Sequence, residues 1–340
     1  MIPEDKLKEV REYLNKSQRP LFLFDDDPDG LSSYLLLKKY CKKGKGIPLK
    51  TSPKIDERFV YKVEWISPDY IFVLDKPIIT QNFVDLVEPK IIWIDHHPVV
   101  NIDGVKYYNP LVYDSKDNRP TSYWCYKITQ QNLWIAICGI VGDWHIPDFF
   151  SEFTKKYPDL VGKNILDPGY LLFETDLGKL IKIFAFSLKG KNSDVKRCIN
   201  VLEKIDNPYE LLNLTTSRSR LVNKHFENIN KRYLRVYEEA EDCVDDSDLL
   251  LFIYPSSLHS FTGELSNELL HNYPDKLIIV GRKKEDDVIM SLRWKKPIPP
   301  ILEKALENVE GYGGGHTNAC GARVANKDFN LFIETLRSLM

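Results

Sequence analysis

The stretch Leu21–Ser33, which reads LFLFDDDPDGLSS, decides the expected fold and the expected site. Its first four residues, Leu21–Phe24, are all apolar, which is typical of a strand buried on both faces of a parallel sheet. Carboxylates at alternate positions and a glycine come directly after them: Asp25, Asp27, Asp29 and Gly30. A helix pattern begins at Leu31, so the sequence predicts a strand, an acidic turn and a helix.

The acidic turn has two interpretations. Carboxylates this close repel one another, and some of their pKa values rise unless a cation lies among them. A divalent metal bound at the carboxyl end of a strand, where open α/β sheets place their sites, would relieve that repulsion. The alternative is an acidic loop that caps a helix, since Asp is common before helices.

Composition places few limits on function. The chain has 340 residues, 43% of them hydrophobic and 28% charged, which is ordinary for a globular protein of two or three domains. The net charge of -2 means that any affinity for nucleic acid must come from a local patch. No C-x-x-C pair, signal peptide or bilayer-length apolar run is evident, which predicts a cytoplasmic protein without a membrane segment.

Further apolar runs also end in acidic residues. They are Tyr70–Leu74 before Asp75, Ile91–Ile94 before Asp95-His96-His97, and Leu133–Val141 before Gly142-Asp143. With the first strand, these endings predict one cluster of carboxylate and imidazole ligands where the segments meet. The alternation of strand and helix patterns predicts an α/β domain, with a mostly parallel sheet and helices on both faces.

The second half of the chain predicts a connector and a smaller domain. We expect a catalytic domain over 1–207, with a helical extension from about 149, and a long charged connector helix within 208–245. A smaller α/β domain is expected over 246–340. It contains the glycine-rich stretch 311–318, which reads GYGGGHTN and is either a tight turn or a nest of backbone amides for a phosphate.

In this order and at these spacings, the motifs resemble those of the DHH phosphoesterases. The motifs are D-x-D-x-D-G at 25–30, Asp75, Asp95-His96-His97, Gly142-Asp143, and a glycine-rich stretch like that of the DHH-associated C-terminal domain. The first motif is more similar to the RecJ type than to the type in nanoRNases, cyclic-dinucleotide phosphodiesterases and family II pyrophosphatases. The closest resemblance is to compact archaeal RecJ-like proteins.

The resemblance implies a metal centre with two divalent ions, Mn²⁺ in the first place and Mg²⁺ as the competitor. It implies that Asp25 and Asp27 bind one ion and that Asp29 binds the other. Asp75 would bridge the two ions. His96 and Asp143 would complete the second ion's ligands.

The resemblance also implies catalytic and substrate-binding residues. His97 would face the substrate phosphate and Asp95 would orient an imidazole. The residues expected to bind substrate are Ser122, Arg293, Gly313, Gly314, Gly315 and His316. In departure from many relatives, Lys76-Pro77 follows Asp75, and the bulky Trp144 follows Asp143.

The resemblance implies a manganese-dependent exonuclease. It would hydrolyse single-stranded DNA or RNA from one end to nucleoside monophosphates, in contact with replication or repair proteins. The first alternative is a small-substrate phosphoesterase for very short oligonucleotides, linear dinucleotides or 3′-phosphoadenosine 5′-phosphate. The second is a non-catalytic replication scaffold, which lost metal ligands would mark; all the expected ligands are present.

Overall fold

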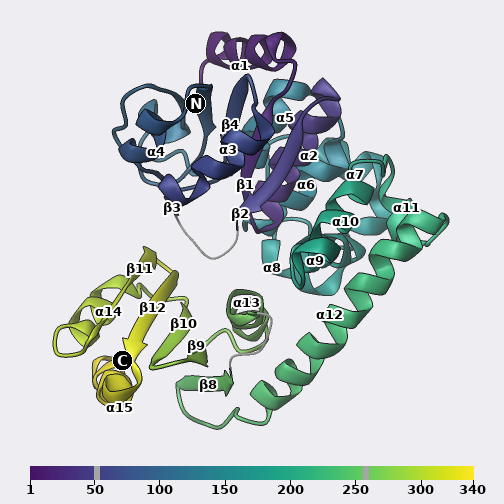
Figure 1. The fold of residues 1–340 in the computed structure, drawn as a ribbon. Coiled ribbons are helices and arrows are strands. Elements are labelled where there is room, and N and C mark those ends of the chain that lie inside the picture. Colours follow the sequence, from purple (N-terminus) through teal and green to yellow (C-terminus); the bar gives the residue numbers. More distant parts are fainter. Residues whose placement is uncertain (50–53, 256–259) are drawn as a thin grey trace. The chain divides into compact units, whose positions relative to one another are not determined.

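A computed structural model describes residues 1–49, 54–255 and 260–340 (Figure 1). The chain divides into two compact units, Met1–Phe226 and Glu227–Met340, which are described separately. Among the described residues, no helix is both long enough and apolar enough to cross a membrane.

The first unit is built on a five-stranded sheet with the strand order β2-β1-β4-β6-β7. All neighbouring strands in it are parallel. The strands are β1 (Leu21–Asp25), β2 (Lys45–Leu49), β4 (Tyr70–Leu74), β6 (Lys90–Ile94) and β7 (Val105–Tyr108). The expected strands β1, β4 and β6 form its centre, and the expected parallel α/β architecture is confirmed.

Both faces of this sheet are covered. On one face, Leu23, Val73 and Trp93 pack with Val63 of α3 (Val60–Ile66) and Phe83 of α4 (Gln81–Leu86). On the other face lies α2 (Pro28–Cys41), whose Tyr34 ring stacks on Phe24 at 4.6 Å between centroids and meets Phe22 edge-on at 5.5 Å. The alternation of side chains along β1 therefore contributes to two cores, as a strand buried on both sides requires.

One expected strand end is a helix end instead. Leu133–Gly142 forms α6, which packs with α2 and with α5 (Thr121–Thr129). The run is apolar at nearly every position, so it has no periodicity that separates a buried strand from a buried helix. Asp143 therefore follows α6 as its C-cap residue.

The remaining elements of the first unit are mostly helices. They are α1 (Glu4–Lys16), α7 (Phe150–Lys156), α8 (Pro168–Glu174), α9 (Asp176–Ser187), α10 (Asn192–Leu202) and α11 (Pro208–Leu212), with the short strands β3 (Lys54–Ile55) and β5 (Ile78–Ile79). The expected helix from 208 onward is broken before α12 (Ser217–Glu241), where Leu214 has a left-handed φ of 51°. The boundary between the units lies within α12, and the expected domain limits at 207 and 245 remain predictions.

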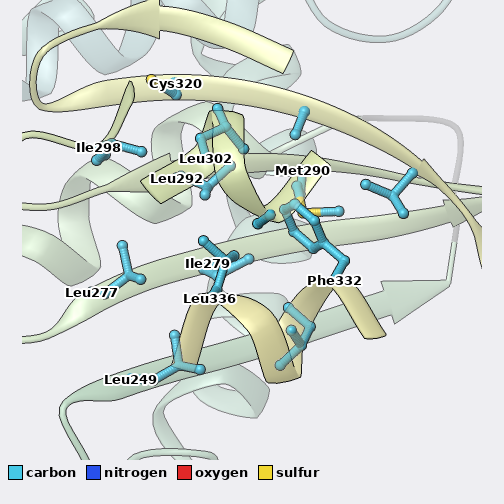
Figure 2. Packing of buried hydrophobic residues seen from close by; sticks show 14 of the residues in the cluster. Leu249, Leu277, Ile279, Met290, Leu292, Ile298, Leu302, Cys320, Phe332 and Leu336 are labelled. Atoms are coloured by element: carbon cyan, nitrogen blue, oxygen red, sulfur yellow. The ribbon is translucent and has the colours of Figure 1, made fainter. Parts of the chain in front are cut away.

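The second unit contains a five-stranded sheet in the order β11-β12-β10-β9-β8. Its elements are β8 (Leu249–Pro255), α13 (Thr262–Asn272), β9 (Leu277–Lys284), β10 (Asp287–Arg293), α14 (Pro299–Leu306), β11 (Gly311–His316), β12 (Ala319–Ala325) and α15 (Phe329–Leu339). Among its described strands, only β8 and β9 pair in parallel. Figure 2 shows the core of this unit, in which Ile279, Met290, Phe332 and Leu336 are buried together. The expected smaller α/β domain is confirmed.

The glycine-rich stretch is a strand and not a turn or an isolated loop. Gly311–His316 forms the edge strand β11, and all its residues are exposed. It pairs with β12, a strand that was not predicted from the sequence. Gly315 alone in this strand has a left-handed φ, of 150°, which a residue with a side chain rarely adopts. Pairing along β12 sends alternate amides to the neighbouring strand, so the amides of this stretch do not all converge on one point.

The packing at Gly30 predicts the effect of a single methyl group. A Cβ at Gly30 would lie 2.5 Å from the carbonyl oxygen of Asp25 and 2.8 Å from its backbone nitrogen, neither of which can rotate away. We expect Gly30→Ala to lower the free energy of unfolding by about 1–3 kcal/mol, as overpacking usually does. Urea unfolding followed by circular dichroism measures the change.

Gly263 provides the matched control, because a Cβ there would meet nothing within 4 Å and the residue lies in the first turn of α13. Gly263→Ala should be neutral or stabilising by at most about 1 kcal/mol. Equal unfolding curves for the two variants would show that the turn after β1 can accommodate a side chain.

Candidate metal centre

The centre lies where the carboxyl ends of three adjacent strands meet. Asp25 is the last residue of β1, Asp75 follows β4, and Asp95 follows β6. β1 pairs with β4, and β4 pairs with β6. The chain continues outward from β1 to β2 on one side and from β4 to β6 on the other, so the acidic residues lie at the point where the strand order reverses. Open α/β sheets place their ligands at such a point.

The turn after β4 aims two consecutive side chains into this region. Asp75 has a left-handed φ of 59°, and its N–H donates to the carbonyl of Ile94 at 3.0 Å. The indole N–H of Trp93 donates to the carbonyl of Lys76 at 2.9 Å. In a regular strand, successive side chains alternate between faces. The left-handed residue interrupts that alternation, and both Asp75 and Lys76 are buried, with exposed fractions of 1% and 2%.

His96 is close to carboxylates from different elements. Its Nε2 lies 3.3 Å from Oδ1 of Asp75 and 3.8 Å from Oδ2 of Asp143. Within the described part of the chain, two sets of three side chains have ligand atoms that all lie within 4.8 Å of one another. They are Asp75, His96 and His97, and Asp29, His96 and Asp143.

Helix α5 holds Asp29 and touches Asp75. The backbone N–H groups of Thr121 and Ser122 donate to the two carboxylate oxygens of Asp29, each at 2.8 Å. The Thr121 hydroxyl donates to Oδ1 of Asp75 at 3.2 Å. The side chain of Ser122 is buried, and its Oγ faces the position of Gly139 in α6. Ser122 therefore contacts the centre through its backbone N–H and not through its hydroxyl. That Ser122 binds substrate stays a prediction.

The centre is electrostatically suited to a cation. Burial and the carboxylates of Asp25 and Asp29 raise the pKa of Asp27 well above its usual value. Burial and the neighbouring carboxylates, Asp29 first among them, also raise the pKa of Asp75 well above its usual value. Burial also raises the pKa of Asp143 to about 6, with Asp29 adding to the effect and His96 opposing it. A bound divalent ion removes this repulsion, and carboxylate with imidazole is a ligand set that such ions accept.

His97 and Asp95 form a dyad beside these ligands. Nδ1 of His97 lies 2.8 Å from Oδ1 of Asp95, whose other oxygen accepts the backbone N–H of His97 at 3.1 Å. Asn109 donates to the carbonyl of His97 at 2.8 Å and fixes the same segment. Burial alone would lower the pKa of His97, but the hydrogen bond to Asp95 and the nearby carboxylates outweigh it, so the pKa is raised.

The structure thus brings most of the predicted metal ligands of the first unit together. Two of them, Asp25 and Asp27, contact protein groups that the sequence did not predict. Asp25, predicted to bind a metal, forms an ion pair in which Nζ of Lys76 lies 2.9 Å from Oδ1. Asp27 caps α2 by accepting the N–H of Gly30 at 2.8 Å. From the sequence, Lys76 is expected only as a basic group near the site, with no partner named, and Asn109 has no predicted role.

The predicted substrate-binding residues of the second unit lie on two strands of one sheet that are separated by a third strand. Arg293 ends β10, and β12 lies between β10 and β11, which contains Gly313–Gly315 and His316. The Arg293 Nε donates to Asn267 at 2.5 Å, and Nη1 donates to the carbonyl of Leu292 at 2.9 Å. Burial lowers the pKa of Arg293 to about 10, so it remains protonated at neutral pH. Some of the N–H donors of Arg293 are therefore already bonded to groups within the second unit.

Comparison with known proteins gives similarities over both units. Residues 261–340 match the model of the DHHA1 domain. RecJ from Thermus thermophilus, solved with Mn²⁺, has a TM-score of 0.69 and 14% identity, covering 99% of this chain and 55% of that one. An exonuclease RecJ bound to manganese has a TM-score of 0.61 and 14% identity, covering 99% of this chain and 95% of that one.

A curated relative matches over a shorter stretch. A tRNA dimethylallyltransferase of Thermosipho melanesiensis is 27% identical over an alignment of 204 residues, and the match covers 54% of this chain and 64% of that protein. The chain thus spans just over half of the Thermus RecJ chain and just under two thirds of this relative.

The parallel sheet of the first unit, the order of the two units and the match over residues 261–340 agree with one another. Residues 261–340 therefore contain a DHHA1 domain, and the chain as a whole has the fold of the RecJ structures.

Proposed function

We propose that the protein is a metal-dependent phosphodiesterase, a RecJ-like exonuclease that hydrolyses single-stranded DNA or RNA from one end to nucleoside monophosphates. One observation carries the proposal. Buried carboxylates and His96 converge at the carboxyl ends of adjacent strands, and the His97–Asp95 dyad lies directly beside them. A cluster of ligands next to a proton-donating imidazole is suited to displacement at phosphorus.

The proposed ligands are the residues predicted from the sequence: Asp25, Asp27, Asp29, Asp75, His96 and Asp143. Mn²⁺ is the proposed ion, with Mg²⁺ as the competitor, and two ions are what the family resemblance implies. Divalent ions bound there would polarise a phosphoryl oxygen and provide a water nucleophile at neutral pH. The two sets of ligand atoms within 4.8 Å both include His96, which makes it the side chain that is most central to binding.

The proposed role of His97 follows from its hydrogen bonds. Its Nδ1 is engaged with Asp95, which leaves Nε2 to hold a proton for the leaving oxygen of the substrate. The hydrogen bond to Asp95 and the nearby carboxylates raise the pKa of His97 above its usual value despite its burial, which extends the pH range in which the ring holds a proton. The His97 side chain is 26% exposed, whereas Asp95 is fully buried, so the imidazole is the accessible member of the dyad.

The second unit is proposed to bind the nucleotide part of the substrate. Gly313–Gly315 offer backbone amides on an exposed edge strand, and His316 ends the same strand. An edge strand has backbone groups that no neighbour occupies on its outer side. Binding energy from parts of a substrate remote from the reacting phosphate can be used to raise turnover.

Ion removal is the first test. Hydrolysis of end-labelled oligonucleotides should stop in excess chelator and return with Mn²⁺, because without a cation the carboxylate cluster repels a phosphate. Asp75→Asn should reduce turnover by roughly 100-fold or more, the lower range of losses when a key electrostatic group is removed. Gln81→Ala, an exposed position at the start of α4, is the control. Full activity in chelator would contradict the proposal.

Substrates of graded length belong in the same assay. DNA and RNA oligomers labelled at the 5′ or 3′ end distinguish an exonuclease from the two alternatives. Turnover confined to dinucleotides would favour the small-substrate enzyme. No turnover of any phosphodiester, with the ions bound, would favour the scaffold.

Separate substitutions test the division of roles in the D-H-H triplet. His97→Ala should lower kcat by about 100-fold or more, as loss of a general acid does, and should keep the ions. His96→Ala should lose ions as well, because its Nε2 faces Asp75 and Asp143. Calorimetric titration with Mn²⁺ measures the binding. The same ion loss in both variants would contradict the separate role of His97.

Substitutions in the second unit test nucleotide binding. His316→Ala and Arg293→Ala should each lower turnover of oligonucleotides by roughly 10- to 1000-fold, which corresponds to about 1.4–4 kcal/mol of transition-state binding. Bis(p-nitrophenyl) phosphate has no nucleotide for this unit to bind, so its hydrolysis should be unchanged. Lys327→Ala, an exposed partner of Glu310 in the same unit, is the control. Equal losses on both substrates would show that these residues do not select nucleotides.

A further inference from the structure

Lys76 is a buried cation at the edge of the proposed metal centre. Its Nζ lies 2.9 Å from Oδ1 of Asp25, and only 2% of its side chain is exposed. A buried ammonium is costly unless it is paired, and removal of one partner of such a pair leaves an uncompensated charge. The ion pair with Asp25 therefore accounts for the position of Lys76 inside the first unit.

The backbone directs Lys76 to this position. The left-handed φ of 59° at Asp75 turns the chain after β4, and the Trp93 indole holds the carbonyl of Lys76 at 2.9 Å. Asp75 would otherwise face the centre alone, because neighbouring residues of a strand point to opposite faces. A conformation that residues with side chains rarely adopt is thus held by hydrogen bonds on both sides of it, which is typical of functional segments.

The closely spaced ligand atoms of the centre come from other residues. Neither set of closely spaced ligand atoms in the described chain contains Asp25 or Asp27. An Asp27 oxygen accepts the N–H of Gly30, and an Asp25 oxygen accepts both Nζ of Lys76 and the N–H of Asp26, the latter at 2.8 Å. The residues expected to bind one of two ions are the ones that contact the ammonium or cap the helix.

We propose that the Lys76 ammonium takes the place of the ion assigned above to Asp25 and Asp27, so that this centre binds a single divalent ion and Asp25 is neutralised by Lys76 and not by a second ion. This inference rests on the proposed metal-dependent function. The single ion would be bound by Asp29, Asp75, His96 and Asp143, which belong to the two closely spaced sets that share His96.

Stoichiometry of Mn²⁺ binding tests the proposal without an activity measurement. The full chain, freed of metal with a chelator, is titrated with MnCl₂ by calorimetry and examined by electron paramagnetic resonance. We expect one ion per chain and the six-line spectrum of an isolated Mn²⁺. Lys76→Met, which removes the charge and keeps most of the volume, should take up a second ion and show the spectrum of a spin-coupled pair.

Two further variants keep the test decisive if Lys76→Met does not fold. Asp25→Asn should bind one ion with an affinity close to that of the unaltered chain, whereas Asp143→Asn should weaken binding by roughly 10- to 100-fold. Lys39→Met is the matched control for loss of a largely buried lysine, because Lys39 pairs with Asp206, which is not among the proposed ligands. It should leave the stoichiometry and the spectrum unchanged.

The outcomes separate this inference from the proposed function. Two ions per unaltered chain, with a spin-coupled spectrum, would overturn the replacement by Lys76 and leave the metal-dependent function standing. Loss of the ion in Asp25→Asn to the same degree as in Asp143→Asn would also overturn it. No ion bound to a folded, unaltered chain would contradict the proposed function itself.

Discussion

Repulsion among carboxylates at the ends of β1 and β4 is the constraint on which the rest of the first unit depends. Each acidic side chain there is held by a donor from a different element. The α5 amides hold Asp29, the first turn of α2 holds Asp27, and Lys76 holds Asp25. Fixed donors restrain Asp25 and Asp29 at positions where their carboxylates help to raise the pKa of Asp27 and of Asp75. The protein therefore keeps together a set of groups that would separate in water, which is the preorganisation that a cation site needs.

Much of this arrangement follows from local sequence. The apolar runs that become β1, β4 and β6 are long enough to be recognised as strands, and acidic residues at their carboxyl ends must meet if the strands are adjacent and parallel. The pattern could not predict the type of element formed by Leu133–Gly142, because an unbroken apolar run fits either a buried strand or a buried helix. β2 was not predicted because Lys45–Leu49 contains Gly46 and Pro48, residues that are unfavourable in strands.

Other features depend on backbone geometry that residue types do not reveal. The donors to Asp29 are amides, which every residue but proline has, so no pattern marks Thr121 and Ser122 as its partners. The left-handed Asp75 and its effect on Lys76 arise from the turn after β4. Glycine likewise permits several conformations. The stretch around Gly313–Gly315 was therefore compatible with a turn or a nest, and pairing with β12 determines that it is a strand.

The D-H-H triplet shows how three consecutive residues can have separate roles. Side-chain exposure rises along it, from 0% for Asp95 through 10% for His96 to 26% for His97. Asp95 accepts from the amide and the ring of His97, and Tyr107 and Asn109 also approach it, at 3.4 and 3.5 Å. Its oxygens are thus occupied by protein donors, which favours an orienting role over metal binding.

His96 turns in the other direction, toward Asp75 and Asp143, while the outermost ring is the one a substrate can reach. The proposed roles therefore follow from how deeply each side chain is buried. In the proposed scheme, the residue at the strand end orients, the next binds the metal, and the third, the most exposed, acts on the substrate. A substitution that shifted β6 by one residue would exchange all three environments at once, because side chains alternate along a strand. The pairing of β6 with β4 and β7, which places Ile94 opposite Leu74 and Tyr108, fixes that depth. The chemistry proposed for the triplet therefore depends on the register of the sheet as much as on the residues themselves.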